Sequence, residues 1–579
     1  MQIIDSFDEE VRNAVKNALL EIGMSDVEFD TEIPSIENVD LAVPCFSMSK
    51  IFGQKPDYIA SKLAESINPS GLIGSVSAFG GYINFSVNES ALVSSTIRDI
   101  IAMGDMYGRY PPKKKKINVE HTSTNPTGPI HVGRARNPII GDTLARILKM
   151  CGYDVSTEYY VNDVGKQVVI LTWGINNLRG EICSEVADQK EGGQRDKIDH
   201  KLVALYRAAN DMIEKDPAVR EEIAEMLRRF EAGEEEIISA VHKTAEIMLD
   251  GLKETLANIN VFLDTYTWES DFIADGSAKA VVETLKKSVY AEKIDGAWSI
   301  DLKNFGVQGK STKFIFLRSD GTTLYTTRDL AYHIDKFRRA DELIDVLGED
   351  QKLGSKQLCS VLKILGSKKM PEPLFYAFVR LPQGKMSTRK GIVVYLDDLI
   401  DEAISRAYTE VKLRHPEMSE EKVKEISKVI GVGAIRYNIV RIQPEKQFTF
   451  KWDEALNFDG NSGPFLQYSY ARACSILKRA GRFNEVADAS KLVDVYEIRL
   501  VKILSRFGSI VKLAGEQRRI HLLPAYGHEI ASAFNQFYVT VPVIGSIEKR
   551  DARLTLVKCF KIVLKNVLTC LGMGAPEEM

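Results

Sequence analysis

The chain has 579 residues, of which 44% are hydrophobic and 27% charged, and its formal net charge is −4. This length exceeds what one hydrophobic core usually serves, so several domains are expected, and the composition is that of an ordinary soluble globular protein. The small net charge excludes a global nucleic-acid footprint, although RNA binding depends on local patches rather than on the sum.

The seven cysteines stand singly, without a CxxC pair or a His/Cys cluster of zinc spacing. Reduced thiols of a cytoplasmic protein are the simplest interpretation, and no protein-bound structural metal is expected. The N-terminus is acidic and amphipathic, unlike a signal peptide, and no long apolar run suggests a membrane span. We therefore expect a cytoplasmic protein that does not insert into membranes.

Residues 1–110 are predicted to form a separate unit with helices and strands. Apolar residues recur at helical spacing over 11–22 and end at Gly23, and residues 83–87 alternate as a strand. Two prolines and the lysines at 113–116 then predict a linker, in which a lysine run is most simply solvated.

The stretch 117–150 predicts a strand, a turn rich in Pro, Gly and Asn, and a helix from about Gly133. His131 then lies at a helix N-terminus just past a strand, where free N–H groups favour phosphate. Taken alone, an HxGx pattern is equally typical of a βα turn with a surface histidine. Pro138 falls inside the helix run, which is tolerable only near the helix start. A second strand at 155–160 completes a Rossmann-type unit that lacks a GxGxxG site.

Residues 170–285 predict a mostly helical insertion with a solvated charged face. The sheet resumes afterwards, with a hairpin at 319–321, a strand that includes Tyr325, and a helix from Arg328 capped by Thr327. Strands at 344–347 and 374–381 follow, and the second leads into GKMSTRKG (384–391), a glycine-bounded basic loop. Beyond about 400 the pattern is helical to the end.

Together, the two motifs resemble the paired signatures of class I aminoacyl-tRNA synthetases, an HIGH-type helix start and a KMSKS-type loop. Longer strings resemble the arginyl-tRNA synthetase family in particular: the E-x4-N-x5-H-x-G spacing from Glu120 to Gly133, LYTTRDLA (324–331), GPFLQYSYAR (463–472), AFNQFY (533–538) and APEEM (575–579). This resemblance runs nearly from end to end.

The resemblance implies an α/β fold with four parts. A Rossmann-like parallel-sheet catalytic domain would comprise 116–170 and 285–400. An α+β N-terminal domain (1–110) would contact the tRNA core, and the helical insertion (170–285) would contact the acceptor end. An all-α domain (400–579) would bind the anticodon.

The implied activity is that of an arginine–tRNA ligase, which makes arginyl-adenylate from L-arginine and ATP, releases pyrophosphate, and transfers arginine to the terminal adenosine of tRNA-Arg. ATP would enter with Mg2+ held by its own phosphates, and monomer is the family's usual state. The implied ATP-binding residues are Asn125, Gly128, His131, Gly133, Arg134, Lys385, Met386 and Ser387. The catalytic set adds Arg389 and Lys390 as further loop cations.

Selection of arginine requires carboxylates, because the planar guanidinium favours bidentate acceptors. Asp329 and Glu120 are the candidates, Tyr325 can stack on or hydrogen-bond the substrate, and Asn125 and Gln351 match further substrate positions of the family. Three of these residues also have a simpler structural interpretation. Asp329 can serve a helix dipole, Tyr325 can pack in a strand, and Glu120 can be a solvated strand end.

Aromatic residues of the C-terminal part match the family's anticodon-contact helices, where flipped bases stack on rings. They are Phe465, Tyr468, Phe534 and Tyr538, and the last residue, Met579, matches a C-terminal contact. Aromatics at such spacing are also common in helical cores, and a chain terminus is often frayed.

The chain departs from the family pattern in two motif positions. Arg134 stands where the second His of HIGH is usual, and Thr388 replaces the second Lys of KMSKS. Some members of the family compensate for the loss of this lysine with a lysine just upstream of HIGH, but Gly128 stands at that position here. Whether Lys390 or Arg389 takes the role of the missing lysine stays open.

Three other functions are compatible with parts of the pattern: a class I synthetase for glutamate, cysteine or lysine, a plain nucleotidyltransferase, and an inactive tRNA-binding paralogue. Tyr325, Asp329 and Gln351 disfavour the first, the large terminal domains disfavour the second, and the intact motifs disfavour the third.

Overall fold

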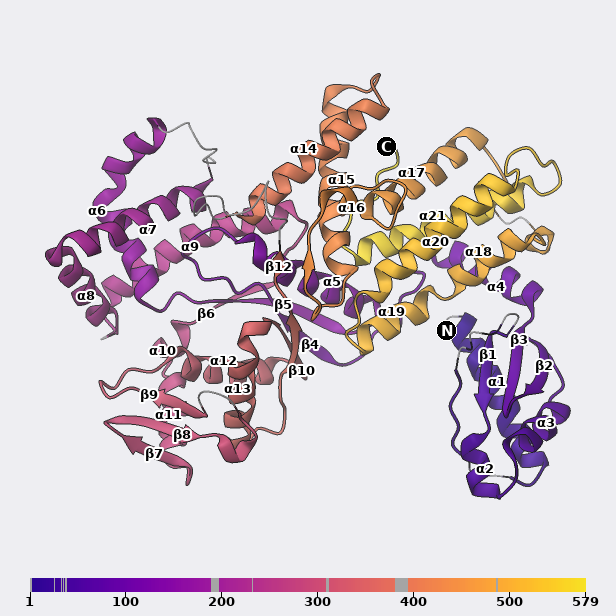
Figure 1. Ribbon diagram of the computed structural model, residues 1–579, viewed down its shortest axis with the longest axis horizontal. Coiled ribbons are helices and arrows are strands. Elements are labelled where there is room, and N and C mark those ends of the chain that lie inside the picture. The colour runs from indigo at the N-terminus through magenta and orange to yellow at the C-terminus, as the bar shows by residue number, and fades with distance from the viewer. Residues whose placement is uncertain are drawn as a thin grey trace.

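The computed structural model describes residues 3–24, 27–32, 34, 36, 39–188, 197–231, 233–308, 312–380, 394–485 and 488–579. A central sheet is surrounded by an N-terminal unit at the lower right of Figure 1, a helical insertion at the left, a small sheet at the lower left and C-terminal helices at the upper right. None of the described helices is both long and apolar enough to span a membrane.

The N-terminal unit is an antiparallel sheet, in the order β1-β3-β2, packed against helices. Its core is separate from the rest and contains fully buried residues such as Val11 and Phe85. The unit comprises α1 (Ile3–Glu21), β1 (Leu41–Pro44), α2 (Phe46–Phe52), α3 (Pro56–Ser66), β2 (Ile73–Phe79) and β3 (Tyr82–Val87). The expected α+β N-terminal domain is confirmed, and α4 (Glu89–Met103) with η1 (Gly104–Met106) leads on to the central sheet.

The central sheet has five parallel strands in the order β11-β10-β4-β5-β6. They are β4 (Lys116–Glu120), β5 (Asp154–Val161), β6 (Thr265–Trp268), β10 (Glu342–Gly348) and β11 (Glu372–Tyr376). From β4 the chain adds β5 and β6 on one side, and it later returns to add β10 and β11 on the other. Such a reversal opens a crevice beyond the carboxyl ends of β4 and β10, where ligands bind. The Rossmann-like prediction is confirmed.

The helices beside this sheet are α5 (Arg136–Met150), α12 (Tyr325–Arg339) and α13 (Lys352–Ile364). The two faces of the sheet differ in chemistry, because successive side chains of a strand alternate. Val119 of β4 is part of the apolar core shared with α5. Glu120 points to the other face, where its carboxylate meets α12. Because Glu120 is in register with Asp345 of β10 and Glu158 of β5, this face carries a row of buried carboxylates.

A small antiparallel sheet, in the order β7-β8-β9, precedes α12. This region contains α10 (Asp271–Ala274), α11 (Ser277–Lys286), β7 (Ala291–Ile294), β8 (Ala297–Asp301), η3 (Lys303–Phe305) and β9 (Lys313–Leu317). Two local predictions are wrong here. Tyr325 begins α12 instead of ending a strand, and Thr327 does not cap the helix but donates its hydroxyl to the carbonyl of Phe316 (2.8 Å). A short β-prone run is too weak a signal to decide between strand and helix.

The chain between β5 and β6 forms a helical insertion with its own hydrophobic core. Its helices are α6 (Lys166–Asp188), α7 (Ile198–Lys215), α8 (Pro217–Glu231) and α9 (Glu235–Asn258). Residues 265–268, which the sequence analysis includes in the insertion, instead form the edge strand β6. A strand this short and half exposed has almost no hydrophobic alternation to reveal it.

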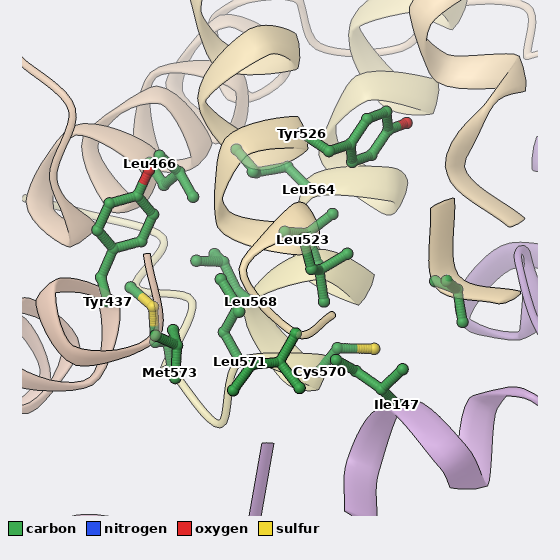
Figure 2. Close-up of a cluster of buried hydrophobic side chains, with 14 of the residues drawn as sticks. Ile147, Tyr437, Leu466, Leu523, Tyr526, Leu564, Leu568, Cys570, Leu571 and Met573 are labelled. Carbon is green, nitrogen blue, oxygen red and sulfur yellow. The ribbon is translucent and has the colours of Figure 1, made fainter. Parts of the chain in front are cut away.

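The C-terminal part is helical, as expected. It comprises α14 (Leu396–Arg414), α15 (Glu420–Val440), β13 (Phe448–Thr449), α16 (Trp452–Ala455), α17 (Gly463–Ala480), η6 (Ala489–Lys491), α18 (Val495–Ser505), α19 (Phe507–Glu516), α20 (Leu522–Thr540) and α21 (Arg550–Cys570). In Figure 2, Tyr437 of α15, Leu523 of α20 and Leu568 of α21 gather in one buried cluster that extends to Ile147 of α5. One core therefore joins these helices to the central sheet.

Arg436 of α15 is fully buried and fixes this junction. It donates to the carbonyls of Leu571 and Ile259, at 2.7 Å each, and forms an ion pair with Asp142 of α5. Gly572 follows with φ of +65°, and a Cβ there would lie 2.1 Å from a guanidinium nitrogen. The approach of the chain end to Arg436 therefore requires a glycine.

Candidate active site

The turn after β4 is strained. Thr122 and Ser123 have φ values of 76° and 32°, although neither is glycine. The N–H of Thr122 donates to Oδ1 of Asn137 in α5 (2.8 Å). The Ser123 hydroxyl donates to Oε1 of Glu120 (3.2 Å) and accepts the N–H of Tyr160 (3.1 Å). These contacts hold the strained backbone at the mouth of the crevice, where it fixes the Glu120 carboxylate.

His131 is the N-cap of a short turn, η2 (Val132–Arg134), that leads into α5. Its Nδ1 accepts the N–H of Gly133 (3.0 Å), which leaves Nε2 to carry the ring proton. Partial desolvation and the nearby Arg134 lower the pKa of His131. The exposed ring is thus neutral at pH 7 and offers one N–H donor to a ligand.

Gly133 is needed for this arrangement, because a Cβ there would lie 3.0 Å from His131 Nδ1. The regular helix starts later than the sequence predicts, at Arg136, because η2 intervenes. Pro138 is consequently the third residue of α5, where its missing N–H breaks no helical hydrogen bond.

The chain that follows the basic loop pairs with the His131 turn. Residues 130–132 and 394–396 are joined by two backbone hydrogen bonds of 2.7 and 3.0 Å, with His131 opposite Tyr395 in an antiparallel bridge. The predicted loop residues lie outside the described part of the chain: Lys385, Met386, Ser387, Thr388, Arg389 and Lys390. On the other side of that loop, β12 (Val379–Arg380) also approaches η2, with the carbonyl of Val379 3.9 Å from a Cβ built on Gly133.

Arg136, the first residue of α5, is fully buried and holds the segment before the loop in place. Its guanidinium donates to four carbonyls, those of Ala377 (3.0 Å), Lys446 (2.8 Å), Ile442 (3.2 Å) and Gln443 (2.9 Å). Burial lowers its pKa to about 10, so it remains a cation at pH 7. This clamp aligns β12 with β13, its parallel partner from the C-terminal part.

The helical insertion contacts α14, the helix that follows the basic loop. Lys197 at the start of α7 donates to Asp199 (2.9 Å) and to Asp397 of α14 (3.2 Å), and His200 Nε2 lies 3.0 Å from an Asp397 oxygen. All four side chains are buried, so this polar cluster links the insertion to α14 just after Tyr395.

The two carboxylates predicted to bind arginine, Asp329 and Glu120, belong to one chain of ion pairs. Lys336 of α12 is fully buried and donates to Glu120 Oε2 (2.6 Å) and to Asp345 Oδ1 (2.9 Å). His333 joins the other side, with Nε2 3.0 Å from Asp345 Oδ2. Its Nδ1 is hydrogen-bonded to the main-chain carbonyl of Asp329 (2.9 Å) and also lies 3.1 Å from Asp329 Oδ1. Asp329 is the open end of this chain, with 36% of its side chain exposed.

The charges of this network follow from its contacts. Burial and Lys336 lower the pKa of His333, but Asp329 and Asp345 outweigh them and raise it to about 10. Burial also lowers the pKa of Lys336, but its two carboxylate partners reverse this effect and raise it. Burial raises the pKa of Glu120 even though Lys336 opposes the shift. His333 and Lys336 are therefore both cations at pH 7.

The remaining predicted arginine contacts lie around the crevice and reach solvent. Tyr325, one turn before Asp329, is 63% exposed. Asn125, in the loop after β4, is exposed and donates to Gln167 at 3.5 Å. Gln351 is exposed in η4 (Glu349–Gln351), which directly follows β10.

Two further predicted ATP contacts flank the His131 turn. Gly128 packs against the insertion, where a Cβ would lie 3.2 Å from a methyl of Val203 in α7. Arg134, the last residue of η2, is half-buried. The described residues of the predicted ATP and arginine sites thus lie at or after the ends of β4 and β10, or at the starts of α5 and α12.

Four residues of this site are not predicted from the sequence: Ser123, Arg136, His333 and Lys336. Helical spacing contains a signal for two of them, since His333 and Lys336 follow Asp329 by four and seven residues and so share one face of α12. Nothing local predicts the roles of Ser123 and Arg136, because their partners lie on other strands and loops.

On the C-terminal helices, Arg472 lies between two predicted anticodon residues, with its guanidinium 4.8 Å from the Tyr468 ring and 5.6 Å from the Tyr538 ring. Tyr538 is 37% exposed. Phe534 is fully buried and stacks on Phe560 with ring centroids 3.8 Å apart. Its ring is therefore core in this structure and cannot stack on a base, contrary to the sequence-based assignment.

The other two anticodon candidates are half-buried. The Phe465 ring lies 5.2 Å from His528, and Met579 packs with Tyr468 on a small apolar cluster that contains Phe458. The chain end is thus held against the same helices.

Comparison with known families agrees with this architecture. Residues 96–452 match the model of the class I tRNA synthetase (R) catalytic domain, residues 466–579 that of the DALR anticodon binding domain, and residues 6–87 that of the arginyl tRNA synthetase N-terminal domain.

Similar proteins cover the full length. The chain is 43% identical to the arginine–tRNA ligase of Methanocella arvoryzae and 39% identical to that of Methanothermobacter thermautotrophicus, over 99% of each chain. Its fold resembles the solved arginyl-tRNA synthetase of Thermus thermophilus, with a TM-score of 0.81 and 26% identity over 99% of this chain and 100% of that one. The chain therefore belongs to the class I arginyl-tRNA synthetases.

Proposed function

We propose that the crevice at the carboxyl ends of β4 and β10 performs the arginine–tRNA ligase reaction in two steps. In the first, a carboxylate oxygen of arginine attacks the α-phosphorus of ATP and pyrophosphate leaves, which gives arginyl-adenylate. In the second, a ribose hydroxyl of the terminal tRNA adenosine attacks the arginyl carbonyl and AMP leaves. Such transfers need mainly positioning and neutralisation of charge.

ATP would lie against the His131 turn. The Nε2–H of His131 and the positive end of the helix that follows suit phosphate oxygens, and Gly133 leaves room for a flat group against the backbone. The backbone pairing of His131 with Tyr395 supports a role for the loop cations Lys385, Arg389 and Lys390 at the same phosphates, with Ser387 and Met386 beside them. We propose that ATP enters as its Mg2+ complex, with the ion held by phosphate oxygens.

Arginine would bind with its guanidinium at Asp329 and Glu120. These carboxylates are held by His333 and Lys336 rather than free to rotate, which favours a fixed bidentate geometry. Tyr325, Asn125 and Gln351 would complete the arginine site from the rim.

The tRNA would extend over the C-terminal helices. Tyr468, Tyr538 and Arg472 form a partly exposed group suited to stacking on anticodon bases, with Phe465 and Met579 at its border. The N-terminal domain (1–110) would contact the tRNA core, and the insertion (170–285) the acceptor end. We propose a monomer that acts in the cytoplasm.

One observation supports this proposal most directly. Both ends of the basic loop lie at the helix start that carries His131, while the same sheet edge carries the linked pair Asp329 and Glu120.

The test is aminoacylation of total tRNA with ATP and each labelled amino acid in turn. Arginine alone should be attached, and ATP–pyrophosphate exchange should be much slower when tRNA is left out. Attachment of glutamate, lysine or cysteine, or exchange without any transfer to tRNA, would contradict the proposal.

A further inference from the structure

Basic side chains on the buried face of α12 lie opposite the row of carboxylates on the central sheet. Glu120 and Asp345 are register partners on adjacent parallel strands, so their carboxylates project to the same side. Lys336 Nζ lies between them, 2.6 Å from one and 2.9 Å from the other. Two like charges forced together in this way need a shared cation.

From Asp345, the ion pairs continue through His333 to Asp329, on the side where arginine is proposed to bind. This imidazole lies between two carboxylates, at 3.0 Å from Asp345 and 3.1 Å from Asp329. His333 is buried, Asp329 at one end of these contacts opens to solvent, and the Glu120 side chain at the other end is 11% exposed. We call the five residues Asp329, His333, Asp345, Lys336 and Glu120 the α12 charge network.

The network contains three carboxylates and two cations, so its net charge is −1. Around it, the charged groups in contact with the sheet face are already paired: Arg339 donates to both oxygens of Glu158, and Arg328 donates to Glu269. Tyr160 and Tyr332, which stack on each other nearby, are neutral because burial raises the pKa of both hydroxyls.

We propose that the α12 charge network carries one uncompensated negative charge that a single bound guanidinium neutralises, and that His333 and Lys336 act in arginine specificity by setting this net charge. This inference rests on the proposed binding of arginine by Asp329 and Glu120. A buried cluster with excess charge is costly until its counterion arrives, so binding of a cationic side chain is favoured over binding of a neutral one of similar shape.

The protonation of His333, Lys336 and Asp345 agrees with this count. His333, with a pKa of about 10, and Lys336 remain cations at neutral pH. Lys336 and His333 outweigh burial and lower the pKa of Asp345, which is ionised. Burial raises the pKa of Glu120 against the opposing effect of Lys336, so an additional positive charge beside Glu120 would stabilise its ionised form. A guanidinium beside it would supply that charge.

The experiment changes the net charge stepwise and measures the Km for arginine and for ATP during aminoacylation. Asp345→Asn brings the network to zero and should raise the arginine Km at least about tenfold, with the ATP Km nearly unchanged. Adding Lys336→Met to Asp345→Asn restores −1 and should return the arginine Km to within about threefold of the wild-type value. The matched control is Asp335→Asn on the exposed side of α12, which should leave the arginine Km unchanged.

A purely structural network predicts the opposite order, with the double variant worse than Asp345→Asn. That result, or a tenfold rise in both Km values alike, would overturn the proposal. His333→Gln added to Asp345→Asn gives a second restoration of −1 in case Lys336→Met does not fold.

The wild-type protein gives an independent reading. Burial raises the pKa of Glu269 to about 7, so kcat/KM for arginine is measured above about pH 8, where this neighbour is ionised. It should then change with pH only through the titration of the α-amino group of arginine itself, until the network cations titrate. A rise with pH that indicates loss of one proton on arginine binding would show a neutral network and contradict the proposal. If the wild type failed to charge tRNA with arginine, the proposed function would fail instead.

Discussion

At the scale of single residues, the site depends on a few side chains whose orientation is fixed by their neighbours. His131 is held in one tautomer by the N–H of Gly133, and Asp329 is held by His333. Catalysis by positioning requires such fixed groups, because small displacements of reacting atoms cost rate. Substitutions that leave the chemistry intact but shift these groups are therefore informative.

Asp329→Ala should raise the Km for arginine far more than the Km for ATP. Loss of a carboxylate partner of a guanidinium costs roughly 2–5 kcal/mol, and the partial exposure of Asp329 places the effect near the lower end. Both constants are measured by ATP–pyrophosphate exchange in the presence of tRNA. Equal effects on the two would remove Asp329 from the arginine pocket.

Gly133→Ala should slow adenylate formation by roughly tenfold to a hundredfold without unfolding the protein. The new methyl would lie 3.0 Å from His131 Nδ1 and displace the ring. Single-turnover formation of adenylate gives the rate. Gly354→Ala in α13 is the matched control, because no atom lies within 4 Å of a Cβ there. An unchanged rate in the Gly133 variant would argue against the fixed imidazole.

At the scale of elements, the helix α5 organises the site because it approaches β4 closely. His121, the residue after β4, is buried against it, and a Cβ on Gly141 would lie 2.3 Å from the His121 ring. Within the described chain, Nε2 of His121 has no hydrogen-bond partner. Burial lowers the pKa of His121 to about 4 from an ordinary value of 6.5.

This buried imidazole should make stability depend on pH. Below pH 6.5 the unfolded chain binds a proton that the folded chain refuses until about pH 4, so the free energy of unfolding falls as pH falls across that window. The expected loss is about 2 kcal/mol between pH 6.5 and 5. Urea unfolding of the wild type and of His121→Gln at pH 7 and pH 5 gives the comparison. The variant should lose about that much less, and equal losses would contradict the assignment.

Elements with strong periodicity are predicted well from the sequence. The strand–turn–helix around β4 and α5, the strands β5 and β10, and the C-terminal helices all appear where alternation or helical spacing indicates them. The failures have physical causes. Tyr325 follows a run too short to decide between strand and helix, and β6 is a short edge strand with little hydrophobic content.

The candidate site divides in the same way. Motif spacing leads to His131, Glu120 and Asp329, which carry local signals. Arg136 acts through four carbonyls of distant loops, and the strain at Ser123 depends on contacts with a neighbouring strand, so neither has a local signature. Long-range contacts of this kind become visible only with the fold.

At the scale of the whole molecule, the chain is divided among several hydrophobic cores, two of which include the catalytic sheet and the N-terminal unit. The catalytic sheet and the C-terminal helices share one core, and Arg436 binds the two across their junction. The N-terminal unit has a core of its own. The first pair should therefore unfold together, and the N-terminal unit by itself.

Phe85→Ala tests this division. Removal of a fully buried ring from the N-terminal core should cost about 3–5 kcal/mol. All four tryptophans lie outside that unit, at positions 173, 268, 298 and 452. Thermal unfolding followed by far-ultraviolet circular dichroism should therefore show an early transition that moves down, while the tryptophan fluorescence midpoint stays in place. An equal shift in both signals would indicate one cooperative unit.

The opposite chemistry of the two sheet faces has a consequence for errors in the gene. Val119 and Glu120 point to opposite faces of the sheet. One inserted or deleted codon within β4 would therefore shift the register by one residue and turn an acidic side chain into the hydrophobic core beside α5. Such a product would not fold into a form that binds any amino acid. An insertion or deletion in β4 thus yields no active enzyme, rather than an enzyme that attaches the wrong amino acid to tRNA.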